Sequence, residues 1–129
     1  DKSNIRRAVL CSGKVYYDLV EALTSTGQTD IGIVRVEQLY PIPHAELDKI
    51  LGSYPEDCEV VWCQEEPQNQ GAWYQTLHNV QSSMREGQTL YYAGRPSSAS
   101  PAVGYFSVHV EEQKTLVHNA ITLGAGWKQ

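Results

Sequence analysis

The chain alternates short apolar runs with segments of helical periodicity, and this alternation constrains its fold more than any other feature. The runs expected to be strands are residues 7–11, 31–36, 59–63 and 89–93. Strands separated by helical segments and short loops indicate βαβ units, in which neighbouring strands are parallel and helices cover both faces of the sheet. We therefore expect an α/β fold with a mostly parallel sheet between two helical layers.

The segments between the runs carry apolar residues at helical spacing. In the first of them, Val15, Leu19, Ala22 and Leu23 fall on one face. Helices are expected at about 14–23, at 44–51, across Trp73 to Met84 and at about 107–122. A length of 129 residues fits a single domain, 1–129, and residues 124–129 are expected to form a flexible tail.

Composition excludes several classes of function. The net charge is −5 and there is no basic block that could follow a phosphate backbone, so nucleic-acid binding is not expected. No apolar run approaches the length of a membrane span. The odd count of three cysteines, Cys11, Cys58 and Cys63, lacks zinc or disulfide spacing, which favours buried reduced thiols and a reducing compartment. The four histidines form no metal motif, and no metal is expected.

Polar or glycine-containing segments follow all four expected strands, at residues 12–14, 37–41, 64–71 and 94–98. In a parallel sheet these segments gather at the carboxyl edge, where open α/β sheets bind ligands or partners. The plainer alternative, that they are ordinary polar loops, stays open. Lys14 lacks the upstream glycine of a phosphate loop, and no nucleophile signature is present.

Glu65 and Glu66 lie in the least ordinary of these segments. Neighbours on an extended backbone point to opposite sides, so a cooperating acid–base pair is not expected. We expect instead that one of them pairs with a cation at a domain or subunit interface. Gly71 allows a tight entry into the next helix. The aromatic residues Trp73, Tyr91 and Tyr92 are expected in the core or at an interface.

Four motifs resemble one family. They are CSGKVYY at 11–17, IVRVEQLYP at 33–41, WCQEEPQNQGAW at 62–73 and YAGRPSSASPAVG at 92–104. Together they look like the C-terminal domain of the thiamine-diphosphate-dependent 2-oxoglutarate dehydrogenase component. The resemblance implies a transketolase C-terminal-type fold, a three-layer sandwich with about five strands.

The resemblance also implies a role. The full-length enzyme would decarboxylate 2-oxoglutarate with thiamine diphosphate and Mg²⁺. It would pass a succinyl group to the dihydrolipoyl succinyltransferase component, act as a homodimer, and lie in the cytoplasm of a bacterium or the mitochondrial matrix of a eukaryote. The cofactor-anchoring residues of the family are missing from these motifs, so the domain itself is expected to be inactive and to hold no cofactor. Its partners would be the upstream domains and the second subunit.

Some members of this family bind AMP or acetyl-CoA as effectors. Lys14, Gln64, Gln70 and Arg95 follow three different strands and offer two cations and two amides, so we expect them to form part of such a site. Three alternatives stay open. The chain could be a stand-alone adenine-nucleotide-binding module, a subunit of a split enzyme, or the C-terminal domain of a 2-oxoadipate dehydrogenase.

Overall fold

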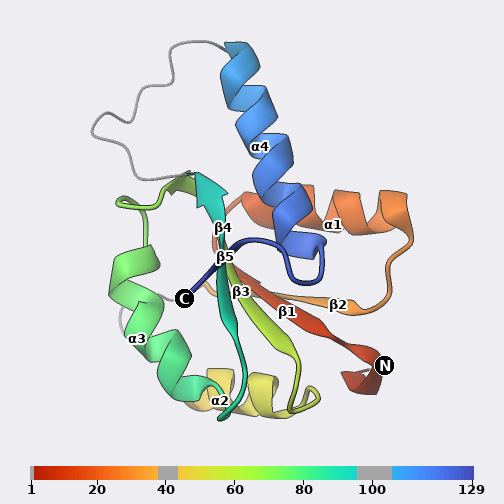
Figure 1. Cartoon of the computed structure of the whole chain (residues 1–129), viewed down its shortest axis with the longest axis vertical. Helices are drawn as coiled ribbons and strands as arrows, with labels where there is room; N and C mark the ends of the chain where they lie inside the picture. Colours follow the sequence, from red (N-terminus) through yellow and green to blue (C-terminus); the bar gives the residue numbers. More distant parts are fainter. Residues whose placement is uncertain (1, 38–43, 96–105) are drawn as a thin grey trace.

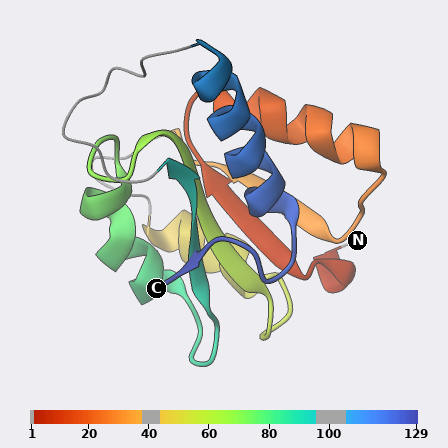
Figure 2. The ribbon, with the colours of Figure 1, turned by 45° about the horizontal axis from the view of Figure 1, so that its top comes forward.

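The chain forms three layers, with a five-stranded sheet between two pairs of helices (Figure 1). The computed structural model describes residues 2–37, 44–95 and 106–129, and it describes side chains from residue 110 onward in the last stretch. Helices α1 and α4 cover one face of the sheet, and α2 and α3 cover the other (Figures 1 and 2). The expected α/β sandwich is confirmed.

The sheet has the strand order β2-β1-β3-β4-β5. Its strands are β1 (Arg7–Cys11), β2 (Ile31–Arg35), β3 (Glu59–Pro67), β4 (Leu90–Arg95) and β5 (Trp127–Lys128). The first four run parallel to one another, whereas β5 runs antiparallel to β4. The mostly parallel sheet is confirmed, and β5 supplies the fifth strand.

The helices begin and end close to the expected residues. They are α1 (Val15–Thr26), α2 (His44–Gly52), α3 (Trp73–Ser83) and α4 (Phe106–Ile121), preceded by a short 3-10 helix, η1 (Lys2–Asn4). No helix within the described ranges has the length and apolarity that a bilayer crossing requires.

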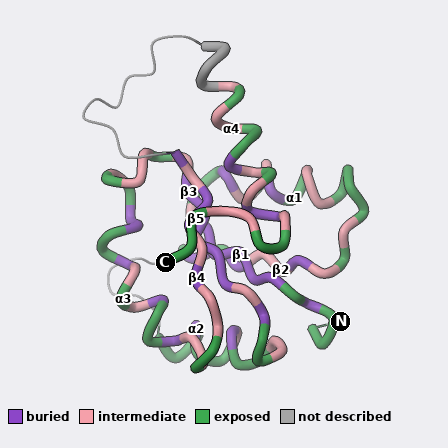
Figure 3. Tube along the Cα trace, in the orientation of Figure 1, coloured by how far each residue is buried: buried purple, intermediate pink, exposed green. Residues whose placement is uncertain are grey.

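The sheet divides the core in two, because successive side chains of a strand point to opposite faces. Ala8 and Leu10 pack on the side of α2 and α3, while Val9 and Cys11 pack on the side of α1 and α4. The buried residues follow the strands in Figure 3.

The largest aromatic residues belong to the core on the α3 side. Trp62, Trp73 and Tyr92 are at most 1% exposed, so these three residues form core and not an exposed interface. Tyr91 is partly buried on the opposite face.

Two strands run further than the sequence indicates. β3 continues from Cys63 to Pro67, and β4 continues to Arg95, with Pro67 and Arg95 in register after an irregularity. The amide of Gln68 also donates to the carbonyl of Arg95 over 3.0 Å. The polar residues after Cys63 end the apolar pattern but not the hydrogen bonding, so the loop expected at 64–71 is partly strand.

Residues 124–129, expected to be a flexible tail, are anchored to the sheet in this structure. Trp127 pairs with Tyr92 in the antiparallel ladder, and their rings stack with centroids 5.4 Å apart. Gly126 has φ 102°, and a β-carbon there would lie 2.9 Å from the Tyr92 carbonyl oxygen. Glycine at this position lets the tail approach β4 closely.

Candidate functional site

The carboxyl edge of the sheet is hollowed between β1 and β3. The chain leaves β1 toward β2 on one side, while β3 lies on the other, so this is the point where the strand order reverses. A cavity of about 290 Å³ lies there, lined by Ser12, Gly13, Trp62, Gln64, Glu66, Gly71 and Ala72. Open α/β sheets bind ligands at such points.

The alternation of side chains along β3 divides the predicted site. Gln64 and Glu66 line the cavity together with the residues before α3. Glu65 contacts Lys14 and a residue of α4, so it lies on the opposite face of the sheet. The expectation that Glu65 and Glu66 diverge is confirmed.

Gln64 is a structural hub on the α3 side. Its side-chain oxygen accepts a hydrogen bond from the Trp62 indole over 2.9 Å. Its amide nitrogen donates to the carbonyl oxygens of Glu66, Pro67 and Gln70 over 2.8 to 3.1 Å. Gln64 is 3% exposed, so its hydrogen bonds are shielded from water and hold the loop before α3 in place. Gln70 takes part in this network through its backbone carbonyl.

Gly71 closes this loop with φ 68°. A β-carbon there would lie 3.2 Å from the Gln64 side-chain oxygen and from the Glu66 β-carbon. The left-handed conformation and the close approach both favour glycine, as the sequence predicts.

Lys14 and Arg95 meet at Glu65 on the α1 and α4 side. The Lys14 Nζ lies 2.9 Å from Glu65 Oε1, and Arg95 donates to the Glu65 carbonyl oxygen. The hydrogen bond to Glu65 raises the pKa of Lys14. The structure therefore brings two of the four predicted residues together through an acidic residue, and places Gln64 and Gln70 on the other face.

Gln113 of α4 completes this cluster. It donates 2.8 Å hydrogen bonds to Glu65 Oε1 and to Asp18 Oδ2, and it accepts one from Arg95 over 3.0 Å. Arg95 is 5% exposed and also lies 3.4 Å from Glu112, whereas the Lys14 side chain is 81% exposed. Arg95 thus links β4 to α4 inside the domain, while Lys14 is open to solvent.

The two cysteines of this edge are buried and hard to ionise. Burial raises the pKa of the Cys11 thiol to about 11 and raises that of Cys63 as well, so both stay protonated and weakly nucleophilic near neutral pH. Across the residues that the structure describes, no group of three or more His, Cys, Asp and Glu side chains could hold a metal ion.

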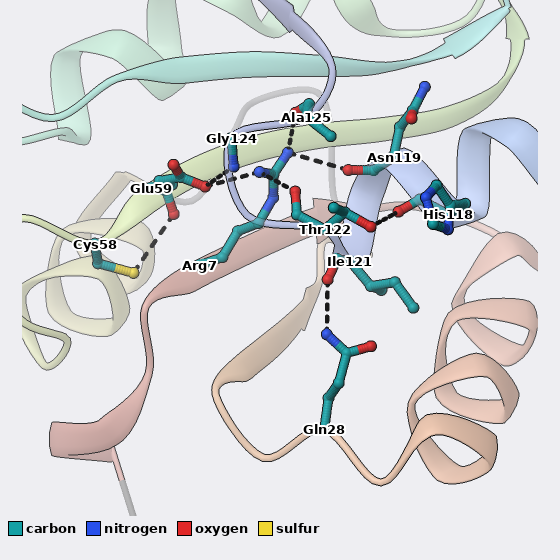
Figure 4. Close-up of polar contacts among 10 residues, drawn as sticks. All are labelled: Arg7, Gln28, Cys58, Glu59, His118, Asn119, Ile121, Thr122, Gly124 and Ala125. Carbon is teal, nitrogen blue, oxygen red and sulfur yellow. Dashed lines mark hydrogen bonds and ion pairs between the residues drawn. The ribbon is translucent and has the colours of Figure 1, made fainter.

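Arg7 is the residue that sequence reasoning missed. Its guanidinium is fully buried at the opposite edge of the sheet, where it donates to the carbonyl oxygens of Asn119, Thr122 and Ala125 (Figure 4). It also pairs with Glu59. Burial lowers the pKa of Arg7, and Glu59 opposes that effect. A charged residue opening the apolar run at 7–11 was the available signal.

Comparison with known proteins identifies the family. The family described as 2-oxoglutarate dehydrogenase C-terminal matches residues 1–121. The 2-oxoglutarate dehydrogenase E1 component of Haemophilus influenzae is 53% identical over 122 residues, which are 95% of this chain and 13% of that protein. The proteins of the same name from Cupriavidus necator and Azotobacter vinelandii are 52% and 50% identical over 92% and 95% of this chain.

The chain spans 12–13% of the length of these relatives. The resemblance carried by the four motifs is confirmed. The chain belongs to the 2-oxoglutarate dehydrogenase C-terminal family.

Proposed function

We propose that the chain is a non-catalytic C-terminal domain of a 2-oxoglutarate dehydrogenase E1 component, with a structural and regulatory role. The observation that carries the proposal is an identity of 50–53% to three proteins of that name. Their name also supports 2-oxoglutarate over 2-oxoadipate as the substrate. Because the relatives are bacterial, the expected location is the bacterial cytoplasm.

In the full-length enzyme, thiamine diphosphate and Mg²⁺ would supply the decarboxylation chemistry. The succinyl group would pass to the dihydrolipoyl succinyltransferase component, and the enzyme would be a homodimer. The contribution of these 129 residues would be to support the neighbouring domains. The pairing of Gln64, Glu65 and Arg95 with groups of the same domain supports this non-catalytic role.

The test of this proposal compares the 129-residue chain with the full-length enzyme. The chain alone should neither bind thiamine diphosphate with Mg²⁺ in a calorimetric titration nor release CO₂ from 2-oxoglutarate. The full-length enzyme should do both. Saturable micromolar binding to the short chain would contradict the proposal.

We also propose that the carboxyl edge takes part in binding an adenine-nucleotide effector, AMP or acetyl-CoA. The cavity at the reversal point of the strand order supports this second proposal, as does the accessible Lys14, which follows the cavity-lining Gly13 in the chain. Lys14 would contact a phosphate, and Gln70 would offer its amide. Gln64 and Arg95 would hold the edge in shape, because their side chains already bond within the domain.

The regulatory proposal is tested in the full-length enzyme. Lys14→Ala should lower the ratio of activated to basal turnover for AMP or acetyl-CoA. Lys49→Ala, which removes an exposed lysine on α2, should leave that ratio unchanged. A normal response from Lys14→Ala would place the effector site elsewhere, while the proposed domain assignment would stand.

A further inference from the structure

A groove of about 480 Å³ lies between α1 and α4, on the outer side of that helical layer. Its sides include Asp18, Glu21 and Ala22 of α1, and Lys114, Val117 and His118 of α4. It is separate from the cavity at the carboxyl edge, whose lining comes from the β1 and β3 ends and the residues before α3. In Figures 1 and 2 the two helices lie side by side on the same face of the sheet.

Hydrogen bonds tie the two helices together near both ends of this groove. Toward the start of α1, Gln113 donates to Asp18 over 2.8 Å. Beyond the end of α1, Gln28 donates to the carbonyl oxygen of Ile121 over 2.9 Å. Together with the hydrophobic cluster that the two helices share, these two ties hold α1 and α4 together along the groove.

The groove has an apolar floor and two walls of opposite charge. Ala22 and Val117 supply apolar surface between the helices. Asp18 and Glu21 make the α1 wall acidic, whereas Lys114 gives the α4 wall a positive charge and His118 adds a polar ring.

We propose that this groove holds an amphipathic helix from the part of the parent polypeptide that lies outside these 129 residues. The inference rests on the proposed function, in which the chain is one domain of a longer enzyme. The docked helix would place apolar residues over Ala22 and Val117. Its acidic side chains would face the α4 wall, and its basic side chains would face the α1 wall.

One observation and one general argument favour an occupant from the same polypeptide. The chain makes up only 13% of the Haemophilus relative, so most of such an enzyme lies outside this domain. A covalently connected helix also meets the groove at a high effective concentration, which lets a modest, partly charged surface bind stably. The mixed charges of the walls would further fix the direction in which the helix lies.

The test is site-specific photo-crosslinking in the full-length enzyme. Ser25→p-benzoylphenylalanine places the photoreactive group on an exposed residue that lines the groove. Gln81→p-benzoylphenylalanine, on an exposed position of α3, is the matched control. Mixing isotopically heavy and light enzyme separates links within one polypeptide from links between copies.

The expected result is a link from position 25 to one segment outside the 129 residues, in the same polypeptide, with apolar residues at helical spacing. Position 81 should not link to that segment. Links that stay within the 129 residues, links solely to a second copy, or no link from position 25 would each overturn the proposal. If the enzyme still turns over, the proposed domain assignment survives such a failure.

Charge reversal adds a second readout with the photoreactive group kept at position 25. Glu21→Lys and Lys114→Glu should each lower the crosslink yield about fivefold, because each turns an attraction to the docked helix into a repulsion. The double reversal should lower the yield further. Recovery of the yield in the double variant would show that the two walls attract each other directly, and the docked helix would be ruled out.

Discussion

Arg7 and Glu59 face each other on the neighbouring strands β1 and β3, and their side chains form an ion pair with Nη1 and Oε1 2.7 Å apart. Glu59 also accepts a 3.0 Å hydrogen bond from the amide of Gly124 (Figure 4). Because Arg7 bonds the carbonyl oxygens that follow the last turn of α4, the pair fastens that helix and the tail to the sheet.

We expect Arg7→Ala to lower the free energy of unfolding of the chain by about 3–5 kcal/mol, because it leaves Glu59 and three carbonyl groups without their partner. Arg7→Lys should lower the free energy of unfolding by a smaller amount, because the ammonium keeps the charge but cannot reach all four acceptors. Arg6→Ala, at the exposed neighbouring position, should change it by less than about 0.5 kcal/mol. Urea unfolding measures all three, and a change below about 1 kcal/mol for Arg7→Ala would contradict the assigned role.

The sequence predicts the layers of this fold well, because buried strands and one-sided helices leave strong apolar patterns. The strand starting at Glu59 and the helix starting at Trp73 are examples. The sequence predicts the C-terminal end of the chain less well. Trp127 and Lys128 form a strand that is stabilised by contact with β4, and two exposed residues carry no pattern that would reveal it.

The sequence predicted which residues lie at the candidate site better than it predicted how they are arranged. With the end of the third strand placed at Cys63, the sequence predicted that Glu65 and Glu66 diverge but not which face of the sheet each of them takes. Once β3 continues to Pro67, Gln64 and Glu65 must point to opposite faces. Glu65 does pair with a cation, as expected, but that cation is Lys14 of the same domain and not a residue across an interface.

Because Gln64 forms a hub of hydrogen bonds, we expect its substitution to destabilise the chain much more than substitution of Gln70. Gln64→Leu keeps the approximate side-chain volume but removes the partner of the Trp62 indole and of three carbonyl oxygens. It should therefore lower the free energy of unfolding by about 2–4 kcal/mol. Gln70→Ala keeps the carbonyl that accepts from Gln64 and should cost less than about 1 kcal/mol. Thermal unfolding of both variants compares them, and equal losses would argue against the hub.

The stacking of Trp127 on Tyr92 predicts that the C-terminal residues stabilise the chain. Trp127→Ala should cost about 1–2 kcal/mol by removing the ring and weakening the short ladder of β5, while Trp127→Phe should recover part of this loss. Hydrogen exchange should show protection of the Gln129 amide, which donates to the Leu90 carbonyl over 2.9 Å. Unchanged stability in Trp127→Ala together with fast exchange would favour a flexible tail.

The buried thiols predict a loss of stability at alkaline pH. Burial raises the pKa of Cys11 and Cys58 from 9.0 to about 11, because the thiolate would lose its hydration, and burial raises the pKa of Cys63 in the same direction. A folded-state pKa above the unfolded value means that the folded chain binds the proton more tightly. The resulting stabilisation is complete below about pH 9 and is lost as the pH rises toward 11, on the order of 1–2 kcal/mol for each thiol.

Unfolding curves at pH 8 and pH 10.5 measure this loss, and Cys58→Ala should reduce the difference between the two curves. Equal stability at both pH values would show that the thiols ionise as easily in the folded chain as in the unfolded one.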